Sequence, residues 1–146
     1  MNRMIREQIV KLNEAVGKTN ALYGLWAKQK GLNYNSLMVL YSIDEVKDCT
    51  QKKISDLWLI PKQTVNSILN DLKEKGYVTV TPAKMNRKEK ILAFTEAGET
   101  YAGALLEGLR NAEERAMRRL GAEACGRYVE LSFAFMNAFK YEVEHE

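Results

Sequence analysis

The sequence predicts a mainly α-helical fold with one small β-hairpin, in which long helices at both ends flank a group of shorter elements. Apolar residues recur at helical spacings over residues 1–31 and again over 96–146, as in amphipathic helices. Between these regions, two β-prone runs at 77–81 and 90–95 flank a polar loop, which predicts the hairpin. The helices just before the hairpin identify the motif at the centre of the chain.

The central helix is predicted to run from Pro61 to Lys75. Proline suits the first position of a helix, where its missing N–H removes no bond, and Gly76 suits the left-handed residue just past the end. Four apolar residues form one stripe for the core, namely Val65, Ile68, Leu69 and Leu72. The opposite face carries amides and hydroxyls: Gln63, Ser67 and Asn70, flanked by Thr64 and Asn66. Such groups hydrogen-bond base edges in the major groove, as a recognition helix requires.

A shorter helix precedes the central helix, and the hairpin follows it. Residues 51–59 form the shorter helix, which contains Ile54, Leu57 and Trp58, and Ile60 occupies the turn. Basic residues gather near the tip of the hairpin, at Lys84, Arg87 and Lys88. Helix, turn, helix and hairpin in this order make a winged helix-turn-helix, so DNA binding is predicted.

The distribution of charge supports this prediction independently. Residues 50–95 contain nine Lys and Arg against four Asp and Glu, a balance of +5, whereas the rest of the chain has a balance of −2. A total charge of +3 alone would say little about a nucleic-acid partner. Positive charge confined to the segment with the DNA-binding pattern is a more specific signal.

The composition argues against several other kinds of protein. A chain of 146 residues that is 46% apolar can form one domain with a sizeable core. Cys49 and Cys125 are too isolated for a disulfide framework or a metal site, and the one histidine, His145, lies next to the end. We therefore expect no metal, no cofactor and no catalytic residue. Without an apolar run that could span a bilayer or serve as a signal segment, we expect a cytoplasmic protein with no membrane partner.

Polar caps divide the remaining chain into helices. Asn33 or Asn35 can cap a second helix, Thr50 caps the helix at 51–59, and Thr95 caps a long helix that Gly121 ends. The link just before Thr50 is the usual place for a third small strand. A final helix is expected from about residue 122 to the end.

The terminal helices carry more apolar surface than one subunit of this size can cover. The first has Ile5, Ile9, Leu12, Val16, Tyr23 and Trp26 on one stripe, and the last is apolar almost all round in its middle. We therefore expect an obligate homodimer. The expected organisation is a single domain, residues 1–146, in which 1–31 and 96–146 are dimerisation helices and 32–95 form the DNA-binding lobe.

The order of elements and three motifs resemble the MarR (multiple antibiotic resistance regulator) family of bacterial transcription factors over essentially the whole chain. The motifs lie at 61–66, 72–78 and 86–98. In the family, the last motif usually carries Asp-x-Arg at the wing tip. Here Asn86 stands at the place of the acid and Lys88 at that of the arginine, so Lys88 is expected to meet a phosphate as a point charge. Arg87 can substitute for the arginine.

The resemblance implies a homodimeric regulator, often a repressor, that binds a pseudo-palindromic operator in double-stranded DNA. It also implies a small aromatic or lipophilic effector. The candidate recognition residues are Lys62, Gln63, Thr64, Asn66, Ser67 and Asn70. The candidate wing residues are Lys84, Asn86, Arg87, Lys88 and Lys90, and the candidate effector pocket is formed by Trp26, Tyr34, Met38 and Tyr101.

A second hypothesis keeps the same fold but makes it a protein-interaction module that does not read DNA. Such a module would more often expose aromatic residues on the central helix, where this sequence has amides and hydroxyls. An enzyme is a third hypothesis, and the lack of an imidazole near any candidate nucleophile counts against it.

Overall fold

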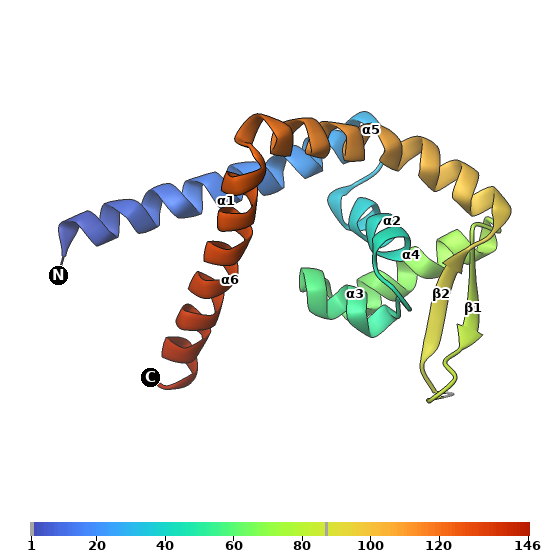
Figure 1. The fold of residues 1–146 in the computed structure, drawn as a ribbon. Helices are drawn as coiled ribbons and strands as arrows, with labels where there is room; N and C mark the ends of the chain where they lie inside the picture. The colour runs from blue at the N-terminus through green and yellow to red at the C-terminus, as the bar shows by residue number, and fades with distance from the viewer. Residues whose placement is uncertain (1, 87) are drawn as a thin grey trace. The chain divides into compact units, whose positions relative to one another are not determined.

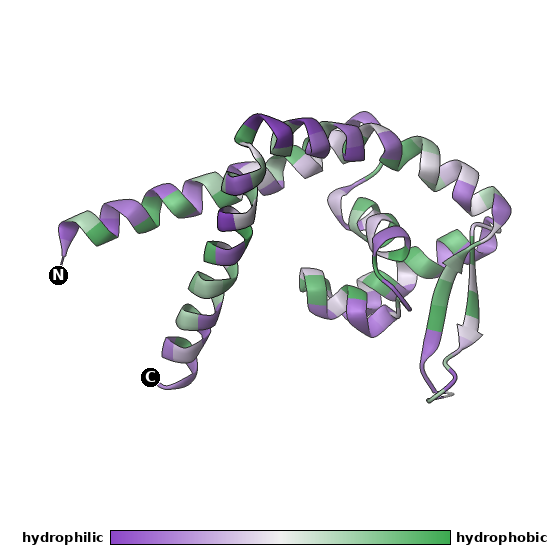
Figure 2. Ribbon diagram, in the orientation of Figure 1, coloured by the Kyte–Doolittle hydropathy of each residue, from purple (hydrophilic) through white to green (hydrophobic). Residues whose placement is uncertain are grey.

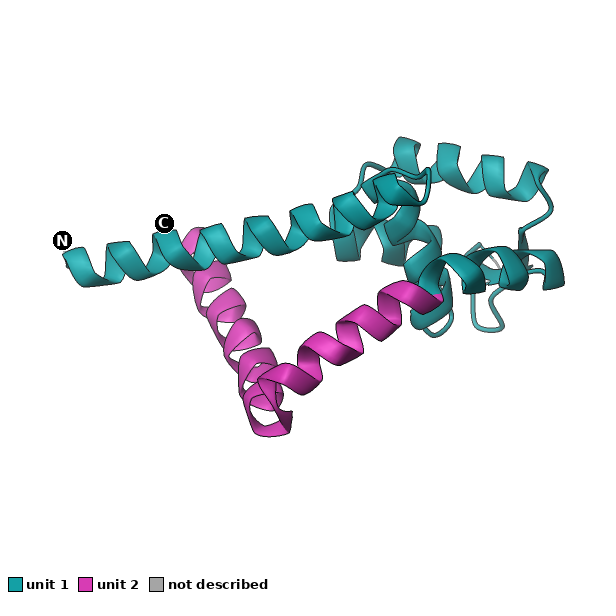
Figure 3. Cartoon of the chain, turned by 90° about the horizontal axis from the view of Figure 1, so that it is seen from above, with its two compact units in different colours: residues 1–106 teal, residues 107–146 magenta. Residues whose placement is uncertain are grey.

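The computed structural model describes residues 2–86 and 88–146 (Figure 1). The elements in chain order are α1 (Arg3–Gln29), α2 (Tyr34–Glu45), α3 (Gln51–Trp58), α4 (Lys62–Glu74), β1 (Val78–Pro82), β2 (Lys90–Phe94), α5 (Glu96–Leu120) and α6 (Ala122–Glu144). The predicted fold class, mainly helical with one antiparallel hairpin, is confirmed. The chain forms two compact units, residues 1–106 and 107–146 (Figure 3).

Helix α2 lies at the centre of the first unit. It packs against α1, α3, α4 and β2, and it is apolar on nearly every side, as a helix surrounded by other elements must be. Leu37, Leu40 and Ile43 are buried, and Met38 and Val39 are buried with them. The core is therefore built around α2, with the buried side chains of α3, α4 and the hairpin packed onto it.

The polar caps predicted from the sequence begin the helices of this unit. Asn33, one of the two candidates, accepts a hydrogen bond from the Ser36 backbone N–H at 2.8 Å and so caps α2. Thr50 accepts one from the Lys53 N–H at 3.2 Å and caps α3. The residue pair Thr50 and Ile91 forms an isolated β-bridge, and the Leu92 N–H donates to the Cys49 carbonyl at 2.8 Å. The predicted third strand is thus a single bridge that ties the start of α3 to the hairpin.

Helix α4 has the predicted apolar stripe but slightly different ends. Pro61 has an extended backbone with ψ 139°, so it stands before the helix instead of at its first position. At the other end, Gly76 has φ +74° as predicted. The Tyr77 N–H donates to the Leu72 carbonyl at 2.9 Å and the Gly76 N–H to the Lys73 carbonyl at 3.0 Å, which together close a Schellman motif. Tyr77 therefore belongs to the helix cap, and β1 begins one residue later than predicted.

The start of α5 is fastened to this cap. Thr95 accepts a hydrogen bond from the Gly98 N–H at 3.1 Å, as the predicted cap, and its hydroxyl also donates to the Gly76 carbonyl at 2.5 Å. Its own N–H donates to the Tyr77 carbonyl at 3.0 Å. The rings of Tyr77 and Tyr101 stack with centroids 4.5 Å apart. We call this group, Gly76, Tyr77, Thr95, Gly98 and Tyr101, the α4–α5 joint.

The second unit consists of the C-terminal part of α5, a turn at Gly121 with φ +93°, and α6. The Cys125 thiol donates to the Met117 carbonyl at 3.0 Å across this turn. Within this unit, α6 buries no side chain. Apolar and polar residues are interspersed along α6 and α1 (Figure 2). Each helix in the described part of the chain is too short or too polar to cross a bilayer.

The α4–α5 joint predicts opposite effects for two glycines of α5. A Cβ at Gly98 would lie 1.9 Å from the Tyr77 carbonyl oxygen, whereas a Cβ at Gly103 would meet nothing within 4 Å. Gly98→Ala should lower the free energy of unfolding by about 1–3 kcal/mol because backbone must move. Gly103→Ala should raise it by about 0.5–1 kcal/mol because alanine is the better helix former. Urea unfolding of both variants measures this difference, and equal effects would contradict the close approach at Gly98.

Candidate nucleic-acid interface

Helix α4 presents two chemically distinct faces. Val65, Leu69 and Leu72 are buried against the core, as predicted, and Ile68 is half-buried. On the opposite face, all the predicted recognition residues are exposed except Thr64, which is half-buried: Lys62, Gln63, Asn66, Ser67 and Asn70. The helix therefore offers a row of amide and hydroxyl groups to solvent, with a lysine at its N-terminal end.

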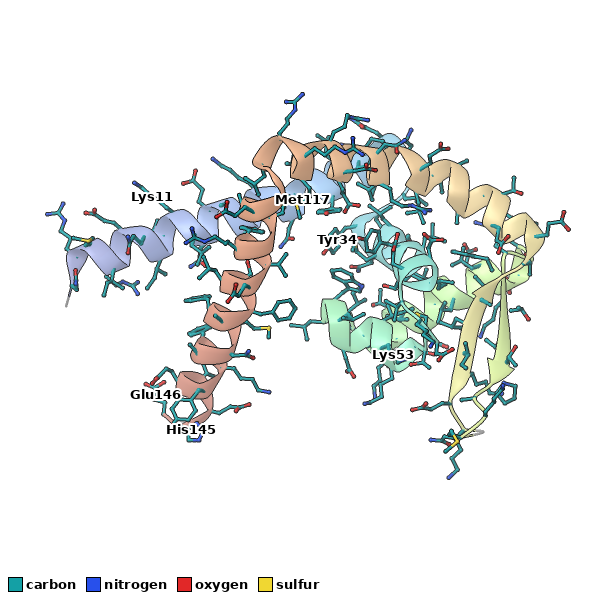
Figure 4. All side chains as sticks on the ribbon, viewed as in Figure 1. Lys11, Tyr34, Lys53, Met117, His145 and Glu146 are labelled. Atoms are coloured by element: carbon teal, nitrogen blue, oxygen red, sulfur yellow. The ribbon has the colours of Figure 1, made fainter. Side chains whose placement is uncertain are left out.

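Helix α3 is held firmly against α2 and α4. The Trp58 indole N–H donates to the buried Ser42 hydroxyl at 2.7 Å, and that hydroxyl donates in turn to the Met38 carbonyl at 2.6 Å. The Gln51 side chain donates to the Lys62 carbonyl at 3.2 Å, which joins the starts of α3 and α4. Lys53, labelled in Figure 4, donates to the Lys47 and Asp48 carbonyls and closes the loop before α3. The exposed face of α4 thus rests on a rigid support.

The hairpin forms a wing beside this helix pair (Figure 1). Its register runs from the pair Val78 and Phe94 to the pair Pro82 and Lys90. At the tip, the Asn86 side chain accepts a hydrogen bond from the Lys88 N–H at 3.1 Å, and the Glu89 N–H donates to the Asn86 carbonyl at 3.0 Å. Asn86 therefore shapes the turn, a function that asparagine performs as well as aspartate.

Three of the remaining predicted wing residues are exposed lysines. The ammonium groups of Lys84, Lys88 and Lys90 belong to exposed residues and give the wing its positive charge. Arg87, which we also predicted as a wing residue, lies outside the described residues.

The surroundings of Lys75 and Cys49 raise the pKa of each side chain. Lys75 donates to the Asp71 carboxylate at 2.9 Å, and this hydrogen bond, together with the charge of Asp71, raises the pKa of Lys75, so it stays protonated. Burial raises the pKa of the Cys49 thiol to about 11, so the thiol is neutral at physiological pH. With 1% of its surface exposed, Cys49 is a small core residue and is not activated for redox chemistry.

The four predicted effector-pocket residues occupy different surroundings. Met38 is only 2% exposed and belongs to the core, because α2 is covered on all sides. Tyr34 stands half-buried at the start of α2 (Figure 4). Trp26 of α1 has the Lys30 ammonium 4.9 Å from its ring centre, and its buried indole N–H has no partner among the described residues. Tyr101 alone of the four lines the cavity described next.

A cavity of about 190 Å³ lies between α2, α4 and α5. Its wall includes Tyr101 together with Ser36, Ser67, Asp71 and Lys75, and its apolar part is formed by leucine and isoleucine side chains. Tyr101 was predicted for this role from the sequence, but the polar residues were not, because they come from helices that are distant in the sequence. Ser67 is also one of the predicted recognition residues, so cavity and reading face share a side chain.

Comparison with known proteins identifies the architecture. Residues 30–89 match the model of the MarR family, and the fold is similar to that of a MarR family regulator from Neisseria meningitidis, with 26% identity, 99% of each chain covered and a TM-score of 0.82. Residues 30–89 therefore resemble the MarR family, and the whole chain shares the fold of its regulators. These matches confirm the predicted winged helix-turn-helix fold and support a DNA-binding transcriptional regulator.

Other MarR structures share the fold at lower identity. A MarR/EmrR family transcriptional regulator from Acinetobacter sp. ADP1 is 19% identical, with 100% of each chain covered and a TM-score of 0.66. A Staphylococcus aureus MarR in complex with salicylate and kanamycin is 16% identical, covers 99% of this chain and 95% of its own, and has a TM-score of 0.62. No functionally curated protein is significantly similar to this sequence.

The exposed amide of Gln63 predicts base reading separable from general DNA affinity. Gln63 can present a donor and an acceptor to adenine, so Gln63→Ala should weaken operator binding by about 1–3 kcal/mol and change binding to a scrambled duplex little. Fluorescence anisotropy on both duplexes measures the two losses. Glu74→Ala on the same exposed face, near the far end of α4, is a control for the loss of a side chain. Equal losses on both duplexes would make Gln63 a backbone contact.

Proposed function

We propose that this protein is a dimeric, sequence-specific regulator in the cytoplasm, that it represses transcription from a pseudo-palindromic operator, and that a small ligand releases it. The observation that carries the proposal is the exposed row of amides and hydroxyls on α4 beside a wing rich in lysine. An amide face reads bases in the major groove, and lysines neutralise phosphates. A protein-interaction surface would be richer in aromatic residues.

The exposed apolar side chains of the terminal helices support the proposed dimer. On α1 these are Met4, Ile5, Val10, Leu12, Val16, Leu22 and Leu25. On α6 they include Tyr128, Leu131, Phe133, Phe135, Met136, Phe139 and Val143. A single chain would leave this surface in water, at a cost of about 25 cal/mol for each Å². We propose that residues 1–31 and 96–146 form the dimer interface and residues 32–95 the DNA-binding lobe of one domain.

The dimer would explain the form of the proposed operator. A two-fold axis repeats α4, so two copies of the recognition residues enter successive major grooves, about 34–36 Å apart, on one side of the duplex. The two half-sites then have related sequences in opposite orientation. This geometry underlies the proposed pseudo-palindrome.

The proposed effector site is the cavity lined by Tyr101 and Ser67. It has an aromatic ring, an apolar wall and a few polar groups, the combination that a small aromatic ligand requires. The Staphylococcus aureus relative is in complex with salicylate, and that observation supports a ligand of similar chemistry here. Since Ser67 belongs to both surfaces, a ligand in the cavity would compete with base reading.

The proposed function predicts salt-dependent binding to a specific duplex. The unmodified protein should shift the DNA upstream of its own gene in a mobility-shift assay, and more tightly than a scrambled duplex of equal length. The affinity should fall as the salt concentration rises, because bound lysines release counterions from the phosphates. A protein that binds neither duplex at low salt would instead support the interaction-module hypothesis.

The proposed dimer predicts a strong effect of charge on α6. Phe139 is 59% exposed in the single chain and its ring stacks on that of Phe135 at 5.9 Å. Phe139→Asp should give monomeric or unfolded protein at micromolar concentration, because a carboxylate cannot be buried unpaired in an apolar interface. Sedimentation velocity measures this, with Lys140→Asp on the same helix as a control for added charge. A stable folded monomer of the unmodified chain would refute the dimer.

A further inference from the structure

A second basic feature lies between the helix pair and the wing. A hollow of about 240 Å³ is enclosed by α3, α4 and the two strands of the hairpin. Its apolar floor includes the buried side chains of Leu69 and Leu92. Exposed lysines from three elements line it: Lys52 of α3, Lys73 of α4, and Lys88 and Lys90 of the wing. We call it the lysine hollow.

The charge in the lysine hollow is largely uncompensated. Lys73, Lys88 and Lys90 form no ion pair within the described part of the chain. Lys52 is paired with Asp56 at 3.5 Å, but both side chains are mostly exposed, and such surface pairs are weak. Glu89 is the acid among the described lining residues. Like charges above a low-dielectric floor focus the electric field, so the hollow attracts an anion.

The lysine hollow also lies beside the reading face of α4. Lys73 follows Asn66 by seven residues and Asn70 by three, so the three side chains lie on the same side of the helix. When α4 enters the major groove and the wing lies along the adjacent minor groove, one DNA strand separates the two grooves. That strand has to pass between α4 and the wing, over the hollow.

We propose that the lysine hollow seats a backbone phosphate of this strand, an inference that rests on the proposed DNA-reading function. Lys52 and Lys73, which were not predicted as DNA contacts from the sequence, then act together with Lys88 and Lys90. Helix α3 begins at the hollow with its Thr50 cap, so the positive end of its dipole adds to the attraction. The seated phosphate fixes the position of α4 along the groove and carries no sequence information itself.

A pair of matched lysine variants tests this assignment. Lys73→Gln should flatten the plot of log affinity against log salt concentration by about 0.9, the contribution of one phosphate, on operator and scrambled duplex alike. Lys47→Gln, in the loop before α3 and outside the hollow lining, removes the same charge and should leave the slope nearly unchanged. Glu89→Gln should strengthen binding to both duplexes, because it removes the acid at the hollow. Equal slopes for the Lys73 and Lys47 variants would overturn the proposal.

Neutral phosphate analogues locate the contact on the DNA. Methylphosphonates placed singly along the operator should reveal a position in each half-site where the unmodified protein loses affinity and the Lys73→Gln variant loses little more. This non-additivity is expected only when both changes remove the same interaction. Additive losses at every position would overturn the proposal, since Lys73 would then contact no phosphate.

Two further outcomes separate this proposal from its premises. If the unmodified protein binds no duplex at all, the proposed function fails and the phosphate seat fails with it. If the protein binds duplexes with the expected salt dependence but Lys73→Gln changes nothing, the seat alone fails. Micromolar binding of inorganic pyrophosphate in calorimetry, lost in Lys73→Gln while the DNA slope is unchanged, would make the lysine hollow a small-anion site and overturn its assignment to DNA.

Discussion

The orientation of the recognition helix depends on one backbone junction, the α4–α5 joint. The carbonyls of Gly76 and Tyr77, which end α4, accept hydrogen bonds from the hydroxyl and the N–H of Thr95, which begins α5. This arrangement needs a left-handed residue at Gly76 and no side chain at Gly98, because the Tyr77 carbonyl occupies the place of a Cβ. The hairpin leaves the joint at Tyr77 and returns to it at Thr95. The joint therefore fixes the positions of helix α4, the wing and the start of α5 relative to one another.

The other end of the reading unit is fixed by a buried polar chain. Trp58 donates to Ser42, and Ser42 donates to the Met38 carbonyl, so the end of α3 is tied to the centre of α2. Both polar groups, the Trp58 indole N–H and the Ser42 hydroxyl, have hydrogen-bond partners. A satisfied polar network in a core favours one arrangement of side chains over others of similar packing. Together with the joint, it defines both helices of the DNA-binding motif relative to the core.

Features determined by neighbouring residues could be predicted from the sequence, and features determined by distant residues could not. The caps at Thr50 and Thr95 and the stripe on α4 were predictable because each depends on residues within one or two helical turns. The burial of Met38 was not, since it follows from α2 being covered by four other elements. The lysine hollow could not be predicted for the same reason: Lys52, Lys73 and the wing lysines are separated in the sequence and come together only in the fold.

The turn at the wing tip affects how such a protein would find its site. Asn86 preserves the turn that an aspartate would make but brings no negative charge to the face that approaches DNA. With lysine at position 88, the proposed contact of this side chain with DNA would depend on charge and not on a directional fork. Such contacts are nearly equal on every sequence, so the wing can exchange one phosphate for the next without a large barrier. If the proposed DNA contacts are correct, such a wing would favour one-dimensional diffusion along DNA, and the amides of α4 would select the operator.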